Sequence, residues 1–332
     1  MLEDLFGSRI IFVTGKGGVG KSAIASAMGI SLRSSGRMPL VVEFSPDRSI
    51  QHTFNINAEP YREIEIGSNL RYFNISSDAA LAEYVKRQLI LDILSKFVIN
   101  TKFYRHFSST APGLKELVAV GKLYDLEKKR DDDGRYLYDP IIVDAPQLGK
   151  FVPFIRTPQT VMEMFKIGPV KKEAEKVYNL INSDKCSVAV VSTPDEMGVT
   201  EAAEAKKELA GAAHPRIAAF FINMTISSKI EVMEPQYYMQ RLGGVAEGGP
   251  VHKSIASAIQ RLLNYAQMER RAIDWLSSRV KGTPVIVLPL IEIPDSELAI
   301  AESLSVHLTP AGGRDGVPTS GTWHQSTRTE RA

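Results

Sequence analysis

The stretch Gly15-Lys16-Gly17-Gly18-Val19-Gly20-Lys21-Ser22 decides how this chain folds. It matches the pattern G-x-x-x-x-G-K-[ST], follows the apolar run Arg9 to Thr14 and precedes a segment with helical spacing. In this pattern the glycines allow a tight turn whose backbone N–H groups can bind phosphate oxygens. Lys21 would bring a positive charge to the terminal phosphates, and Ser22 would offer a hydroxyl to magnesium. The stretch therefore predicts a loop that binds ATP together with Mg²⁺.

A dinucleotide-binding loop is the main alternative for the same residues. Gly15-x-Gly17-x-x-Gly20 fits that pattern, and Glu43 ends the next apolar run near the place of a ribose-binding acid. A dinucleotide loop needs neither the Lys21-Ser22 pair nor a further acid that supports magnesium. Both are present, because Asp144 ends a later apolar run. We therefore favour triphosphate binding, with Ser22 and Asp144 as the metal-supporting residues.

Short apolar runs recur along the chain with helical spacers between them. The runs are Arg9 to Thr14, Pro39 to Phe44, Leu70 to Ile75, Pro140 to Asp144, Ser187 to Thr193, Arg216 to Asn223 and Pro284 to Leu290. Near-continuous hydrophobicity is typical of strands that are covered on both faces. The pattern predicts an α/β fold, a P-loop NTPase with a mostly parallel, doubly wound sheet covered by helices on both faces.

The spacers predict how the chain is divided. We expect one ATPase domain over residues 1–310, with helical insertions at about 76–135, 150–182 and 225–279. From Pro310 onward the sequence is rich in Gly, Pro, Ser, Thr and Arg and almost lacks large apolar residues. Such a composition cannot bury enough apolar surface to fold. Residues 311–332 are therefore predicted to be a disordered tail.

Composition excludes several classes of protein. The 332 residues include 40 basic and 38 acidic ones, so a formal charge of +2 gives no overall attraction to nucleic acid or to an anionic membrane. The single cysteine, Cys186, allows neither an internal disulfide nor a Cys-x-x-Cys site. No apolar run approaches the length that spans a bilayer. These features predict a cytoplasmic protein with no nucleic-acid partner and no stable membrane insertion.

From Lys16 onward the loop resembles the deviant Walker A loop of a group of dimer-forming ATPases. The group includes arsenical-pump ATPases, targeting factors for tail-anchored membrane proteins, and septum-positioning and chromosome-partitioning ATPases. In this group the early lysine reaches across the dimer interface to the partner's nucleotide, which implies the same role for Lys16. A cation in trans stabilises charge on the transferring phosphate only when two subunits meet. The resemblance therefore implies a homodimer, or a heterodimer with a related ATPase, that forms with ATP.

Within this group the chain is most similar to the ArsA-type anion-transporting ATPases, the branch with the arsenical-pump and tail-anchored-targeting proteins. The similarity extends to about residue 310. It rests on Ala111 to Leu117, Tyr138 to Pro146, Ser192 to Glu201 and Asn223. Tyr138 to Pro146 matches the branch's magnesium-supporting strand and its exit. Asn223 matches the position at which members of the branch contact adenine, so the resemblance implies that Asn223 contacts the base.

The departures from the branch concern the chemical step. In the branch the second strand ends in an Asp-Pro motif whose aspartate orients the attacking water, and here the matching residue is Ser45. A serine cannot act as that base, and loss of a catalytic base commonly costs about two to four orders of magnitude in rate. Glu43 and Asp47 flank Ser45, and either carboxylate could replace the missing one. Leu148 and Lys150 replace the threonine and histidine that usually follow the magnesium-supporting strand.

Two functions remain open. The first is an ATP-hydrolysing dimeric switch that couples nucleotide state to the binding, targeting or positioning of a protein cargo or assembly partner. Its candidate catalytic residues are Lys16, Glu43 and Asp47. The second is a hydrolysis-impaired nucleotide-binding subunit that pairs with an active paralogue, which Ser45 favours. With Ser45 in place of the aspartate, we expect ATPase activity to be weak or to depend on a partner.

Apolar helix faces in regions 161–177 and 232–275 could hold an apolar segment of a cargo protein. Burial in the core or at a dimer interface is the commoner use of such faces, and we favour it. The branch's arsenite-binding cysteine cluster and its zinc-binding cysteine pair are absent from this sequence. Metalloid transport is therefore not expected.

Overall fold

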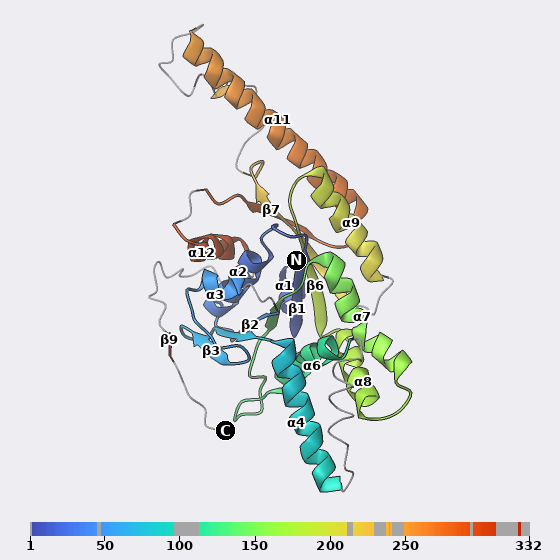
Figure 1. The fold of residues 1–332 in the computed structure, drawn as a ribbon. Coiled ribbons are helices and arrows are strands. Elements are labelled where there is room, and N and C mark those ends of the chain that lie inside the picture. The colour runs from blue at the N-terminus through green and yellow to red at the C-terminus, as the bar shows by residue number, and fades with distance from the viewer. Residues whose placement is uncertain are drawn as a thin grey trace.

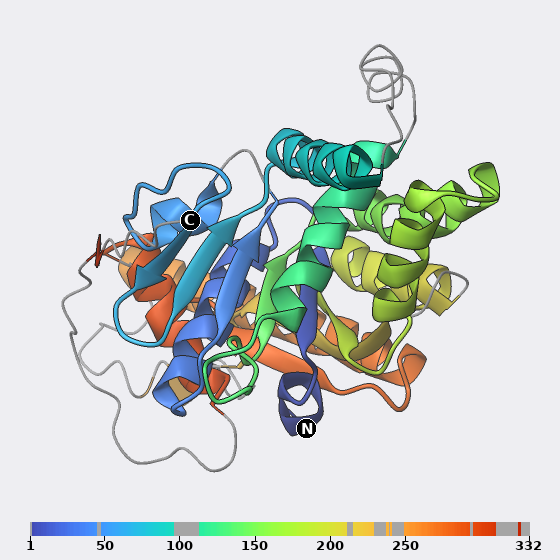
Figure 2. The same ribbon diagram turned by 90° about the horizontal axis from the view of Figure 1, so that it is seen from below.

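The computed structural model describes residues 2–44, 48–95, 113–210, 215–228, 237–238, 240, 249–292, 295–309 and 325–326. Nine strands form one sheet in the order β8-β7-β6-β1-β5-β2-β4-β3-β9. Their bounds are β1 Ile10–Gly15, β2 Leu40–Glu43, β3 Glu63–Ile66, β4 Arg71–Asn74, β5 Ile141–Asp144, β6 Cys186–Ser192, β7 Arg216–Thr225, β8 Val285–Pro289 and β9 Gln325–Ser326. The sheet runs through the middle of the molecule (Figures 1 and 2).

The sheet is parallel from β8 to β4, and only β3 pairs antiparallel, with β4 and β9. Strand β1 lies between β5 and β6, so the chain winds outward from β1 in both directions. Ligands of such sheets bind at the carboxyl ends of the strands, where the order reverses. The predicted α/β class with a mostly parallel, doubly wound sheet is confirmed, and the crevice at the end of β1 is the place to look for a ligand.

Two apolar cores flank the sheet, because successive residues of a strand point to opposite faces. In β1, Ile10 and Phe12 join one core, while Ile11 and Val13 join the other. The first core is covered by α4 Ser77–Ser95, α6 Leu114–Lys128, α7 Leu148–Met164, α8 Pro169–Ile181 and α9 Glu196–Ala210. The second is covered by α1 Leu2–Phe6, α2 Lys21–Ser34, α3 Ser49–Thr53 and α12 Glu297–His307. Helix α11, Pro250–Arg279, extends away from the body (Figure 1).

All seven apolar runs of the sequence form strands within a few residues of their predicted ends. Strand β3 was not predicted. Within the helical insertion predicted at about 76–135, α4 is observed from Ser77 to Ser95, and residues 96–112 lie outside the described residues. The division into a domain over 1–310 and a disordered tail stays a prediction, and the structure describes only β9 beyond residue 309. None of the described helices has the length and apolar character needed to cross a membrane.

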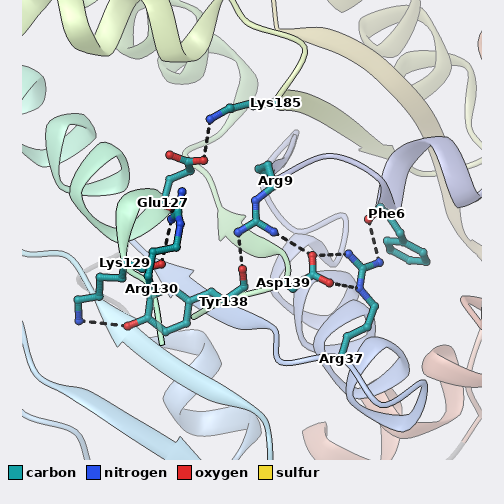
Figure 3. A network of polar contacts seen from close by, with 9 residues as sticks. All are labelled: Phe6, Arg9, Arg37, Glu127, Lys129, Arg130, Tyr138, Asp139 and Lys185. Atoms are coloured by element: carbon teal, nitrogen blue, oxygen red, sulfur yellow. Dashed lines mark hydrogen bonds and ion pairs between the residues drawn. The ribbon is translucent and has the colours of Figure 1, made fainter. Parts of the chain in front are cut away.

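A network of charged side chains lies at the amino ends of the central strands, opposite the carboxyl ends where ligands of such sheets bind (Figure 3). Asp139, just before β5, accepts hydrogen bonds from Arg9 at 2.9 Å and from Arg37 at 2.7 and 2.9 Å. Arg37 also donates to the carbonyl of Phe6 at 2.9 Å. Nearby, Lys185 pairs with the buried Glu127 at 2.9 Å. Asp139 thus connects the start of β1 with the segment that follows α2.

Candidate functional site

The predicted phosphate loop joins the carboxyl end of β1 to the amino end of α2. A Cβ on Gly15 would lie 2.0 Å from the Val191 carbonyl oxygen, so the loop can pass β6 only with a glycine there. A Cβ on Gly20 would lie 2.4 Å from Asn223 Nδ2, and Gly20 has a φ of +90°. Gly20 is also the N-cap of α2, so it has no side chain with which to cap the helix. The backbone N–H groups at this helix end suit a bound anion.

Ser22 and Asp144 meet at the base of the loop. The Ser22 hydroxyl donates a hydrogen bond to Asp144 Oδ2 at 2.6 Å, and Asp144 is 5% exposed. Among the described residues, no group bonds the other carboxylate oxygen, Asp144 Oδ1, although it is buried. Burial raises the pKa of Asp144 to about 6, while the Ser22 hydrogen bond and Lys21 oppose that rise. A buried carboxylate oxygen with spare acceptor capacity beside a hydroxyl suits Mg²⁺, which prefers oxygen ligands.

The two lysines of the loop point to different places. Lys21 Nζ donates to the Lys16 carbonyl at 2.9 Å and lies along the loop. Burial lowers the pKa of Lys21, and Asp144 partly offsets this effect. The side chain of Lys16 is instead 43% exposed, with Nζ 3.0 Å from Glu201 Oε1 and 2.9 Å from the sulfur of Met197. Lys16 therefore contacts α9 of its own chain and stands at the surface.

A cavity of about 780 Å³ extends from the loop toward the end of β8. The end beside the loop is lined by Gly17, Gly18, Gly20, Lys21, Ser22 and Asp144, and the far end by Asn223, Met224, Pro289, Leu290 and Ile291. Asn223 is buried, and its Nδ2 donates to the Val19 carbonyl at 3.0 Å. Its Oδ1 is thereby the side-chain atom left to accept a hydrogen bond from a ligand. The volume lies within the range of small-molecule and cofactor sites.

Glu43 is held away from this cavity. Its side chain is fully buried, and Oε1 accepts from the Ile50 N–H at 3.2 Å while Oε2 accepts from the Tyr72 hydroxyl at 2.7 Å. Burial raises the pKa of Glu43 to about 7, against the hydrogen bonds from Tyr72 and Ile50. Glu43 is not one of the described residues that line the cavity. Asp47, like Ser45, lies outside the described residues.

The predicted residues that the structure brings together around the cavity are Gly17, Gly18, Gly20, Lys21, Ser22, Asp144 and Asn223. Gly15, Lys16, Val19 and Glu43 are not among the described residues that line it. Several lining residues were not predicted. Gln147 and Lys150 line the cavity, and Gln147 Nε2 is 2.8 Å from the position that a Cβ on Gly17 would take. The segment from Pro289 to Ile291 could have been predicted to line the cavity, because it lies at the carboxyl end of a parallel strand, where ligands of such sheets bind.

Comparison with known proteins places the chain in a family. The model of the anion-transporting ATPase family matches residues 8–236. ATPase BagA of Mycobacterium tuberculosis is 30% identical over 259 residues, which cover 76% of this chain and 75% of that protein. A protein of Aquifex aeolicus whose name assigns it to the arsenical pump-driving ATPases is 27% identical over 175 residues, 52% of this chain and 56% of that protein. The family and the names of its members indicate an ATPase. This chain belongs to the anion-transporting ATPase family.

Proposed function

We propose that this protein is an ATP-hydrolysing dimeric switch whose nucleotide state controls the binding, targeting or positioning of a protein partner. The observation that carries the proposal is the Ser22–Asp144 hydrogen bond of 2.6 Å at one end of a cavity whose other end contains Asn223. This arrangement offers oxygen ligands for Mg²⁺ and, at the far end, an amide acceptor for a base.

Each part of the site has a task in this mechanism. The N–H groups of the loop and the Lys21 ammonium bind the phosphates, while Ser22 and Asp144 hold the ion. Bound Mg²⁺ supplies positive charge that offsets the charge developing on the phosphates. Asn223 Oδ1 accepts from the exocyclic amino group of adenine, which a guanine lacks at that position.

Lys16 acts in trans in this proposal. Its side chain is 43% exposed, and so it can leave Glu201 when a second chain approaches. An exposed ion pair contributes only about 0–1 kcal/mol, so exchange of Glu201 for a partner's phosphate costs little. The proposed dimer is a homodimer or a heterodimer with a related ATPase, and we propose a cytoplasmic location.

A hydrolysis-impaired subunit is a second candidate, and the position of Glu43 favours it. Ser45 replaces the aspartate that orients water in the branch, and Glu43 is bonded to Tyr72 and Ile50 instead of facing the cavity. Of the two flanking carboxylates, Asp47 alone is then left as a substitute base. Such a subunit binds ATP tightly and hydrolyses it only with an active paralogue.

Steady-state phosphate release from MgATP by the purified chain tests the proposal, with Lys21→Ala as the control for contaminating ATPases. Turnover that is absent from the control supports the switch. Tight ATP binding without turnover supports the paired subunit. Sedimentation with and without MgATP then tests the dimer. Self-association that is the same with and without the nucleotide contradicts the switch.

A further inference from the structure

The first turn of α7 brings another lysine of this chain to the cavity. Lys150 lines the cavity together with Lys21 and Asp144. Its backbone N–H donates to the Gln147 carbonyl at 2.8 Å, and the Gln147 side chain packs against Gly17 of the loop. Residues three apart lie on the same side of a helix. Lys150 therefore stands one helical turn from the phosphate loop and on its side of α7.

No described residue pairs its charge with the Lys150 ammonium. The Lys150 side chain is exposed, and among the described residues its ammonium forms no hydrogen bond and no ion pair. The first turn of α7, a helix of 17 residues, contains no acidic side chain. The amino end of a helix favours anions, so a cation there is disfavoured unless an anion binds beside it. An anion at this end of the cavity would interact favourably with both Lys150 and the helix.

Lys16 cannot provide this charge from within the same chain in the observed arrangement. It is bonded to Glu201 at 3.0 Å on α9 and is not one of the described residues that line the cavity. The cations that a single chain presents to the cavity from its described residues are Lys21 and Lys150. A terminal phosphate is more anionic than the phosphates before it, so the outermost group gains most from the second cation.

We infer that Lys150 binds the terminal phosphate of ATP in cis and so allows a single protomer to distinguish ATP from ADP. The inference rests on the proposed function, because it requires that the phosphate loop binds nucleotide. Lys150 is then a specificity-determining residue that acts before any partner supplies Lys16. Nucleotide discrimination precedes dimer formation in this scheme instead of following from it.

Calorimetric titration of the full chain with MgADP and with a non-hydrolysable magnesium ATP analogue tests this inference. For Lys150→Gln we expect the affinity for the analogue to fall by about tenfold, as for loss of a charged hydrogen bond. The affinity for ADP should change by less than about twofold on the same reasoning. Lys150→Arg should keep most of the discrimination. The matched control is Lys172→Gln, which removes an exposed charge from α8 and should leave both affinities unchanged.

Each outcome separates this inference from the proposed function. Equal loss for both nucleotides in Lys150→Gln, or no loss for the analogue, overturns the role of Lys150 and leaves nucleotide binding intact. A wild-type chain that binds neither nucleotide overturns the proposed function, and the inference with it. The titrations are repeated in a Lys16→Ala background. If the effect of Lys150→Gln persists there, Lys150 acts in cis, and if it disappears the inference is wrong.

Discussion

Ser22 and Asp144 are joined by a 2.6 Å hydrogen bond between residues 122 positions apart in the sequence. The bond links the first turn of α2 to the last residue of β5, and it leaves Asp144 Oδ1 without a bond from any described residue. The bond holds the loop next to the acid, so an ion bound between them would meet both a hydroxyl and a carboxylate oxygen.

Asp144→Asn should separate magnesium binding from folding. Asparagine keeps an oxygen that can accept from Ser22 but loses the negative charge that faces the ion. We expect the magnesium-dependent gain in ATP affinity to fall by at least about tenfold, in line with loss of a charged contact. Titration of ATP with and without Mg²⁺ measures this, and thermal unfolding checks that the fold is kept. An unchanged magnesium dependence would show that Asp144 does not support the ion.

Lys16→Ala should abolish turnover without weakening nucleotide binding. The lysine is exposed and bonded to Glu201, so its removal should change the free energy of unfolding by less than about 1 kcal/mol. We expect the affinity for ATP to stay within about twofold, because Lys16 lies outside the cavity of its own chain, and phosphate release to fall by at least about a hundredfold. A matched Lys172→Ala variant should behave as wild type. Retained turnover in Lys16→Ala would contradict action in trans.

Gly15→Ala should destabilise the protein far more than Gly36→Ala. Both glycines have positive φ, +154° and +79°, but a Cβ on Gly15 would lie 2.0 Å from a backbone oxygen of β6, whereas one on Gly36 has no described atom within 4 Å. Gly36→Ala should cost about 1 kcal/mol of conformational strain. Gly15→Ala should cost at least about 3 kcal/mol, because β1 and β6 must separate. Urea unfolding of the two variants measures the difference, and equal costs would contradict the close approach.

Glu43 should make stability depend on pH. Burial raises its pKa from 4.5 to about 7, so the native state holds this proton more tightly than the unfolded chain does. The free energy of unfolding should then fall as pH rises from about 4.5 to about 7, by about 2–3 kcal/mol from this one group. Glu43→Gln removes the titration, so its advantage over wild type should grow between pH 5 and pH 8. Parallel pH profiles for the variant and wild type would exclude a raised pKa, and Glu204→Gln, at an exposed position of α9, serves as the control.

Asp139→Ala should weaken the amino edge of the sheet. It leaves the guanidinium groups of Arg9 and Arg37 without their shared acceptor, and both are mostly buried, at 14% and 26% side-chain exposure. We expect a loss of about 1–3 kcal/mol in the free energy of unfolding. Asp133→Ala, at a side chain 72% exposed, should cost less than about 0.5 kcal/mol. Similar costs for the two variants would show that the network contributes nothing specific.

The sequence predicted the parts of the fold that depend on local pattern. Seven apolar runs became strands, and those in the middle of the sheet, such as β1, β5 and β6, are buried throughout because both faces are covered, which makes such runs hydrophobic almost throughout. Strand β3, Glu63–Ile66, was missed because it lies toward the sheet edge and its residues alternate between glutamate and isoleucine, three of them only partly buried. A four-residue alternation is too short to distinguish from a loop. The phosphate loop was predicted because one contiguous motif contains it.

Long-range side-chain contacts could not be predicted from pattern. The position of Glu43 depends on Tyr72, a residue of another strand, which bonds the carboxylate inside the core. The contact of Lys16 with Glu201 spans 185 positions, so no local signal reveals it. Lys150 was noticed only as a departure from the family pattern. Its place in the cavity follows from where α7 begins, just beyond the exit of β5.

The position of Asp139 has a mechanical consequence for the nucleotide site. Arg9 immediately precedes β1, and Arg37 shortly follows α2, so the two arginines stand at the far ends of the elements that the phosphate loop connects. Both donate hydrogen bonds to the Asp139 carboxylate, and Asp139 precedes β5, the strand that ends at Asp144. Strands β1 and β5 and helix α2 therefore share one carboxylate at the ends remote from the cavity, which limits how far the loop at their other end can shift relative to Asp144.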